Sequence, residues 1–456
     1  MQRALAFDRS PPLSVALRFF LNVPVFLMLA ALGLAWVALT GGPHSRWNPV
    51  ILAVAHFCTL GVLASAMLGA MMQILPVATH IGVLRPNITS PVVHGSLSLG
   101  TLSLALGFLI ARPLFHTLAV ILLATAFLVF LAATVLGLIR DRKRRSPGSK
   151  EILTAVRLAL AALAVTIVLG LFMAGMRAGL WSAFSPSAVA WLQNLPDLHA
   201  VWGLAGWVGL LVVGISYQVI PIFQATEIYP RPLTDTLAPI VFLLLLALSV
   251  GADPAVGDTV SLLLRVVPAA LLCLGYLIYA SITAWLLLTR KRPAPEPTTW
   301  FWLVAMASLI FAALLGVAYP WARSDELPSQ TWQMLLGTLL IIGFAVSAVN
   351  GMLYKIVPFL LWHNAQRKAP TALPFMPKVK QFITERHALQ QFAAHLGAVV
   401  LLVAASQFQI MLLPGALALA LSAGLLTRNF SRALRLYLTT CRRIAETTPA
   451  HKGPES

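Results

Sequence analysis

Long apolar runs separated by short polar segments divide the whole chain. A helix that crosses a lipid bilayer needs ~20 predominantly apolar residues, and the chain holds about twelve runs of that length. The expected spans are 14–40, 50–77, 91–111, 114–139, 153–176, 199–223, 236–252, 260–289, 299–320, 331–361, 387–407 and 409–427. The pattern therefore predicts an all-α membrane protein with about 12 transmembrane helices.

Composition and charge place these helices in a bilayer with a defined orientation. Of the 456 residues, 59% are hydrophobic and 10% are charged, which excludes a soluble globule. The net charge of +18 comes from Lys and Arg clusters between the spans, at 140–145, 290–292, 367–386 and 428–443. With a cytoplasmic N-terminus every cluster is cytoplasmic, which is the positive-inside pattern. We therefore expect lipid rather than nucleic acid as the partner, and a bacterial cytoplasmic (inner) membrane protein whose N- and C-termini are both cytoplasmic.

The chain is expected to form one membrane domain, 1–456, that ends in a basic cytoplasmic tail, 428–456. In this tail Arg428, Arg432 and Arg435 have roughly helical spacing beside leucines. Two interpretations stay open, an interfacial amphipathic helix on anionic lipid and an extension of the last span.

A motif of two glycines, one polar residue and one proline occurs three times with identical spacing. The copies are Gly61, Gly69, Gln73 and Pro76; Gly206, Gly214, Gln218 and Pro221; and Gly343, Gly351, Lys355 and Pro358. The prolines lie 145 and 137 residues apart, so the chain reads as a unit of roughly 140 residues used three times.

The three units are about 1–150, 151–296 and 297–427, and each holds four spans. Repeats with an even number of spans keep their orientation in the membrane. We predict three four-helix repeats about a pseudo-threefold axis along the membrane normal.

The motif has two interpretations. Glycines eight residues apart lie on nearly one helix face, where small residues allow close helix packing, and the proline then marks a helix end. Alternatively, Gln73, Gln218 and Lys355 form an inner polar ring that serves a proton path, a ligand or interhelix hydrogen bonds.

Two histidines stand at the outer ends of motif-bearing spans. His56 and His199 lie 17 and 19 residues before the polar motif position, which is about 25–29 Å along a helix. Paired imidazoles at equal depth suit a haem iron or a copper ion. The alternative is a hydrated or hydrogen-bonded histidine at each span end.

Four other residues are further candidates. His116, at the outer start of the fourth span, is a third possible metal ligand, and His94 and His395 are secondary candidates in the cytoplasmic half. Arg177 is a candidate partner for an anion such as a haem propionate, or else a side chain that snorkels to the interface.

Several common functions lack their sequence signature. The chain has no Walker A motif, dinucleotide-binding GxGxxG, HExxH or nucleophile elbow, which argues against an ATPase or a protease. Its three cysteines form no CxxC, so neither a disulfide framework nor a cysteine-rich metal site is indicated.

Three stretches resemble the haem-copper oxidase subunit I superfamily, and most of all its divergent NnrS-like and uncharacterised subunit I-like members. They are HFCTLGVLASAMLGAMMQILPV, HAVWGLAGWVGLLVVGISYQVIPIF and GMLYKIVPFLLWHN. The resemblance implies a subunit I-like scaffold of three four-helix arcs, with His56 at the helix 2 ligand position and His199 approximately at that of helix 6.

The chain also departs from that superfamily. Oxidases and nitric-oxide reductases carry further histidine ligands on helices 7 and 10, but the expected spans 236–252 and 331–361 contain no histidine. We therefore expect no complete oxygen-reducing binuclear centre, and neither terminal oxidase nor nitric-oxide reductase activity.

The leading hypothesis is a haem- or copper-binding membrane protein that acts in electron transfer, metal handling or the response to nitric oxide and related stress, with a redox or respiratory partner protein. Two alternatives stay open. One is a transporter or channel that uses the pseudo-threefold cavity, and the other is a non-catalytic assembly subunit of a respiratory complex.

Overall fold

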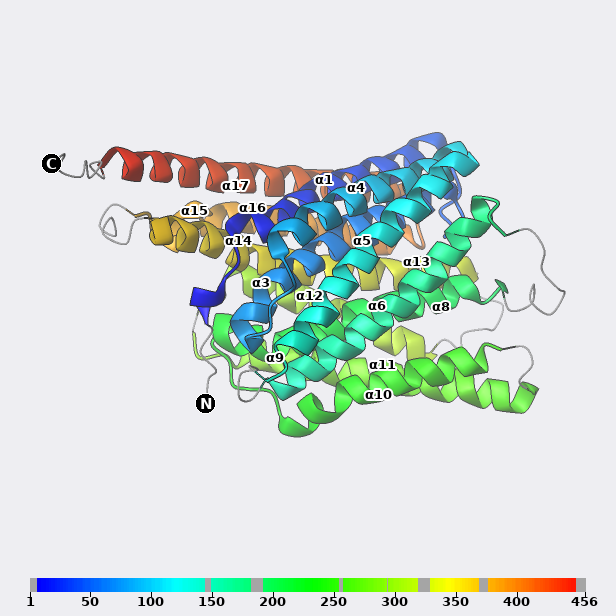
Figure 1. The fold of residues 1–456 in the computed structure, drawn as a ribbon. Coiled ribbons are helices and arrows are strands. Elements are labelled where there is room, and N and C mark those ends of the chain that lie inside the picture. Colours follow the sequence, from blue (N-terminus) through cyan, green and yellow to red (C-terminus); the bar gives the residue numbers. More distant parts are fainter. Residues whose placement is uncertain are drawn as a thin grey trace.

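The computed structural model describes residues 6–143, 149–181, 192–253, 257–292, 294–318, 329–368 and 376–447. These residues form helices and connecting segments, and none of them lies in a β-strand. Twelve helical stretches are long and apolar enough to cross a membrane. They lie roughly side by side in an elongated bundle (Figure 1). The prediction of an all-α, multi-pass membrane protein with about 12 spans is confirmed.

Nine of the spans consist of one α-helix each, and several begin with proline at the first helical position, where its missing N–H costs nothing. These helices are α1 (Leu13–Thr40), α4 (Pro86–Ile110), α5 (Pro113–Arg140), α6 (Lys150–Arg177), α10 (Arg231–Gly251), α11 (Asp258–Leu288), α12 (Pro297–Ala318), α16 (Glu385–Ala405) and α17 (Leu412–Thr447).

The other three spans, which carry the repeated motif, each contain a π-helical segment between two α-helices. The first is α2 (Pro49–His56), η2 (Phe57–Ala64) and α3 (Ser65–Thr79). The second is α8 (Leu195–Val201), η3 (Trp202–Gly209) and α9 (Leu210–Gln224). The third is α13 (Ser329–Thr338), η4 (Leu339–Val346) and α14 (Ser347–Lys368).

The π segments share one register with the sequence motif. Each is eight residues long, and the first motif glycine is its fifth residue, namely Gly61, Gly206 and Gly343. The segments therefore recur at the same intervals of 145 and 137 residues as the motif. Because π-helices are rare and cluster at functional sites, this register distinguishes these three spans from the other nine.

The six motif glycines lie where two helices approach closely. A Cβ atom added at any of them would come within 3.0 Å of another residue's side chain, which real Cβ atoms essentially never do. The neighbours belong to α1 for Gly61 and Gly69, to α6 for Gly206 and Gly214, and to α12 for Gly343 and Gly351. Each of the three motif-bearing spans, called the inner spans from here on, packs against the preceding span through its glycines. The close-packing interpretation of these glycines is confirmed.

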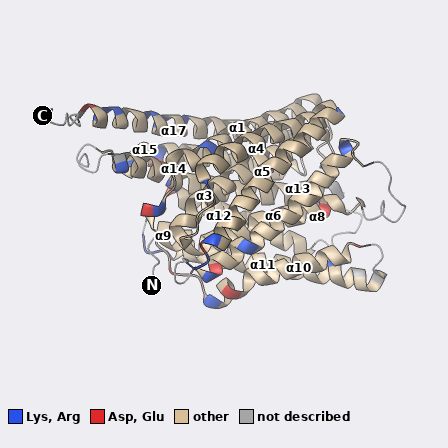
Figure 2. Ribbon diagram, viewed as in Figure 1, with Lys and Arg blue, Asp and Glu red and all other residues tan. Residues whose placement is uncertain are grey.

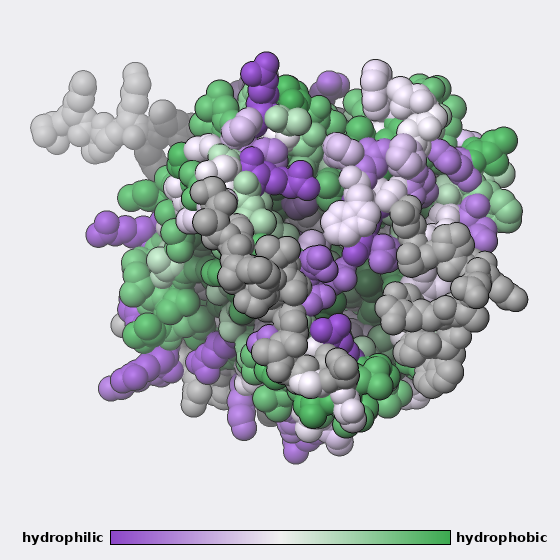
Figure 3. Space-filling model, turned by 90° about the vertical axis from the view of Figure 1, so that its right-hand side faces the viewer, coloured by the Kyte–Doolittle hydropathy of each residue, from purple (hydrophilic) through white to green (hydrophobic). Residues whose placement is uncertain are grey.

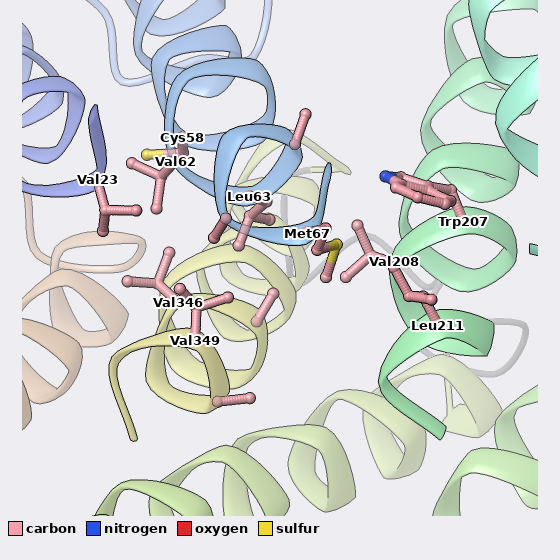
Figure 4. Packing of buried hydrophobic residues seen from close by; sticks show 14 of the residues in the cluster. Val23, Cys58, Val62, Leu63, Met67, Trp207, Val208, Leu211, Val346 and Val349 are labelled. Atoms are coloured by element: carbon pink, nitrogen blue, oxygen red, sulfur yellow. The ribbon is translucent and has the colours of Figure 1, made fainter. Parts of the chain in front are cut away.

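The inner spans also meet one another. The segment η4 contacts both η2 and η3. In the close view Met67 of α3 points toward Val208 of η3 and Leu211 of α9, and Val346 and Val349 come from the third inner span (Figure 4). These side chains belong to the main hydrophobic core. The centre of the bundle is therefore built from the three motif-bearing spans.

Two helices run further than the sequence indicated. Helix α14 continues to Lys368, so His363 lies inside it, and the expectation that this span contains no histidine is wrong. Helix α17 continues to Thr447, well past the expected end at 427 (Figure 1). Tyr437 of α17 donates a hydrogen bond of 2.7 Å to Asn364 of α14, which ties the two extensions together. The tail through Thr447 is thus an extension of the last span.

The two ends of the bundle differ in charge. The start of α1 and the end of α17 lie at the same end, where most Lys and Arg residues gather (Figure 2). The opposite end shows a rim of hydrophobic residues around a more polar middle (Figure 3). The chain is therefore polarised along the direction of its helices.

Candidate functional site

His56 and His199 meet at the end of the bundle opposite the basic clusters. His56 is the last residue of α2, directly before η2, and His199 lies in α8, three residues before η3 begins. Their ring centroids are 6.4 Å apart, and the ring planes differ by 21°. The structure brings together the two residues that were predicted as a pair.

A backbone carbonyl fixes the orientation of each ring. His56 Nδ1 lies 2.7 Å from the carbonyl oxygen of Leu52, and His199 Nδ1 lies 3.0 Å from that of Thr166 in α6. A carbonyl oxygen only accepts hydrogen bonds, so Nδ1 carries the proton in both rings. In the neutral imidazole Nε2 then keeps its lone pair, which is the usual arrangement in a metal-binding histidine.

The two imidazole rings are stacked, with their centroids 6.4 Å apart. Within the described part of the chain, no group of three or more His, Cys, Asp or Glu side chains is placed to hold a metal. Among the described residues, the two imidazoles are therefore the candidate ligands for a metal at this position.

Gly170 leaves the space that the imidazole ring of His199 occupies. A Cβ atom at Gly170 of α6 would lie 2.8 Å from Cε1 of His199. Any side chain there would push the imidazole away from α6 and from its hydrogen bond to Thr166. Gly170 was not identified from the sequence, because a lone glycine within a long apolar helix carries no distinctive pattern.

Phe108 of α4 joins the other two candidates at this end of the bundle. Its ring centroid lies 5.3 Å from that of His56 and 5.6 Å from that of His116. The guanidinium carbon of Arg177 lies 5.4 Å from the Phe108 centroid, and its charge acts on both histidines. His116 and Arg177 therefore border the pair, whereas a ligand role for His116 stays a prediction.

His94 and His395 have neighbours of their own. His94 Nε2 lies 3.1 Å from Asn22 Oδ1, and its ring packs edge-on against Phe19. His395 is fully buried, with Nε2 2.8 Å from the hydroxyl of Ser347. These contacts place both side chains in interhelix hydrogen bonds, whereas Nδ1 of His395 is buried without a partner among the described residues.

The polar motif positions also have different surroundings. Gln73 donates a 3.2 Å hydrogen bond to Ser10, which precedes α1, and Lys355 donates to Glu296, which precedes α12. Gln218 is buried, and neither of its amide atoms has a hydrogen-bond partner among the described residues. For Gln73 and Lys355 the contacts favour the alternative of interhelix hydrogen bonds.

Glu296 is the centre of a cationic cluster at the basic end of the bundle. Its side chain is 14% exposed and lies 3.2 Å from Arg292 and 3.9 Å from Lys380, in addition to its contact with Lys355. Burial alone would raise the pKa of this carboxyl, but the hydrogen bond from Lys355 and the three positive charges outweigh it and hold the pKa below its usual value. Glu296 therefore stays ionised and fastens the third inner span to the segment before α12.

A comparison with models of known protein families gives no match for this chain, and a comparison with curated proteins gives none either.

Proposed function

We propose that His56 and His199 bind one haem iron or one copper ion through their Nε2 atoms, near the outer end of the helix bundle. The supporting observation is the matched state of the two rings. Both donate Nδ1–H to a backbone carbonyl, and their near-parallel planes have centroids 6.4 Å apart.

The surrounding residues give this site its chemistry. A haem iron or a copper ion supplies one-electron redox chemistry when bound. Phe108 and the half-buried setting of both rings restrict the access of water, and Arg177 offers positive charge to an anionic group such as a propionate. The protein then acts in electron transfer, metal handling or the response to nitric oxide and related stress, and a redox or respiratory protein exchanges electrons with it.

The scaffold belongs to the same proposal. We infer that the chain consists of three four-helix repeats about a pseudo-threefold axis, similar to the haem-copper oxidase subunit I superfamily. The common register of the π segments and the packing of each inner span on the preceding one support this. The basic end is cytoplasmic by the positive-inside rule, in a bacterial inner membrane, so the histidine pair lies on the outer side.

Oxygen reduction is not part of the proposal. Helix α10 contains no histidine. His363 of α14 stacks on Phe359, beyond the motif proline Pro358 and toward the basic end. Neither α10 nor α14 supplies a ligand beside the pair, so the proposal does not include oxygen reduction.

The proposal is tested by spectra and metal analysis of purified protein from cells supplied with haem and copper. The wild type should show a reduced-minus-oxidised difference spectrum and stoichiometric iron or copper, and His56→Leu and His199→Leu should each lose both. His44→Leu is the matched control, because His44 lies in a loop and its Nδ1 is also 3.2 Å from a backbone carbonyl, that of Ala405. A folded wild-type protein without colour or metal would contradict the proposal.

A further inference from the structure

A cavity of about 130 Å³ lies at the centre of the bundle, among the helices that follow the π segments. Its wall comes mainly from α3, α9 and α14, with single side chains from α1 and α12. Met67 is part of this wall and lies 11 residues after His56, which places the cavity about 16 Å from the histidine pair along the helix. The cavity is therefore separate from the proposed metal site.

The three helices contribute equivalent positions to the wall. Counting along the motif, one set of lining residues is Ala70, Ile215 and Met352, and another is Ile74, Val219 and Ile356. The members of each set are 145 and 137 residues apart, the same intervals as in the motif. The cavity thus lies where the three inner helices face one another.

The wall is almost entirely apolar. Gln73, Ser216 and the indole of Trp302 carry the polar side-chain atoms among the lining residues, and polar atoms contribute almost nothing to its surface. Ser216 donates to the carbonyl of Val213 at 2.7 Å and accepts from Tyr279 at 3.0 Å, so its hydroxyl is already paired. A buried water needs two to four polar partners, and the unpaired polar atoms among the lining residues, Gln73 Oε1 and Trp302 Nε1, contribute almost nothing to the exposed wall. The apolar wall therefore favours apolar molecules over water and polar solutes.

The size of the cavity selects the ligand. An apolar cavity of ~150 Å³ stays dry and binds benzene or xenon, whereas pockets for drug-sized ligands and cofactors begin at ~300 Å³. We propose that the central cavity is a binding site for a small uncharged apolar molecule, in the size range from a diatomic gas to benzene. This site goes beyond the proposed function and does not depend on a bound metal.

Xenon is the probe that tests the site. Crystals of the full-length protein pressurised with xenon should show an anomalous peak enclosed by α3, α9 and α14. Ala70→Met should abolish the peak, because Ala70 lines the cavity and the longer methionine side chain would occupy its space. Ala161→Met, on the exposed face of α6, is the matched control and should keep the peak.

Three results would overturn the inference. They are a wild-type cavity without xenon, ordered water in its place, and a peak that persists unchanged in Ala70→Met. If Ala70→Met does not fold, Val219→Phe fills the same space from α9 and carries the same expectation. Because metal content is measured separately, failure of the xenon test leaves the proposal for the histidine pair untouched, and the converse also holds.

Discussion

The packing of the inner spans can be tested by adding a methyl group at Gly214 of α9 and removing the one that it meets, at Ala155 of α6. A Cβ atom at Gly214 of α9 would lie 2.5 Å from Cβ of Ala155 in α6, and the next nearest atoms are 3.8 Å away. Gly214→Ala therefore creates a single clash with one methyl group. Ala155→Gly removes that methyl group, so the double variant should restore the contact.

The size of the effect follows from these distances. Carbon atoms in contact prefer ~3.5–4.0 Å, so the two helices must separate by about 1–1.5 Å to accept Gly214→Ala. Overpacking of this kind costs about 1–3 kcal/mol, and the better helix propensity of alanine returns up to about 1 kcal/mol. The coupling free energy between the two substitutions should then be favourable by about 1–3 kcal/mol.

The assay is thermal unfolding in detergent of the wild type, both single variants and the double variant. Gly95→Ala is the matched control, because a Cβ atom at Gly95 of α4 would have no neighbour within 4 Å. Gly214→Ala should unfold at a lower temperature than Gly95→Ala. The double variant Gly214→Ala with Ala155→Gly should recover most of this difference in unfolding temperature. Equal stability of the two glycine variants, with no coupling in the double variant, would refute this account of the packing.

Two further predictions concern the two ends of the bundle. Glu296→Gln should lower stability by about 1–3 kcal/mol through loss of a half-buried ion pair, compared with Glu385→Gln, whose side chain is 56% exposed. The pKa of Glu296 is lower in the folded protein than in the unfolded chain. The stabilisation by its carboxylate is therefore complete above the unfolded pKa of ~4.3 and is lost as the pH falls through the folded pKa. The melting temperature of the wild type should then fall more steeply at acid pH than that of Glu296→Gln. Gly170→Ala should reduce the haem or copper content, because the added methyl group displaces the His199 ring. Gly397→Ala is the control and should leave the content unchanged, because a Cβ atom there meets nothing within 4 Å. Equal metal content in the two variants would contradict this geometry.

Much of the fold was predictable because its signals are local. An apolar run of bilayer length identifies a span wherever it occurs, and helix ends were predicted to within a few residues except where a helix continues outside the membrane. Helix α17 runs on to Thr447, and its Tyr437 donates a hydrogen bond to Asn364 of α14, a contact that hydropathy does not report. The π segments were not predicted, since a change from i+4 to i+5 bonding leaves no composition of its own.

The site was predictable only in part, because it joins distant segments. His56 and His199 were found through their equivalent places in two units, and a single histidine would not have been informative. The residues that orient them are a carbonyl of Thr166, the missing side chain of Gly170 and the ring of Phe108, all ordinary in an apolar helix. The partner of Lys355 could have been suspected, because the chain has 14 acidic residues and Glu296 directly precedes a span.

The alternative of a transporter gains no support from the central cavity. A path for a polar or charged solute needs polar groups along its wall, whereas α3, α9 and α14 face one another with apolar side chains. Lys355 is engaged by Glu296 and Gln73 by Ser10. Gln73 and Lys355 therefore act as contacts that hold the basic end of two inner spans, whereas Gln218 has no such partner among the described residues.

The central claim is that one ion is shared by His56 and His199. X-ray absorption at the metal edge of the purified protein measures this directly, because the fine structure counts imidazole nitrogens around the metal. The account predicts two imidazoles at ~2.0 Å in the wild type and one fewer in any metal retained by His56→Leu or His199→Leu. A bound metal with no imidazole ligand in the wild type, or an imidazole count in both variants that equals the wild-type count, would contradict it.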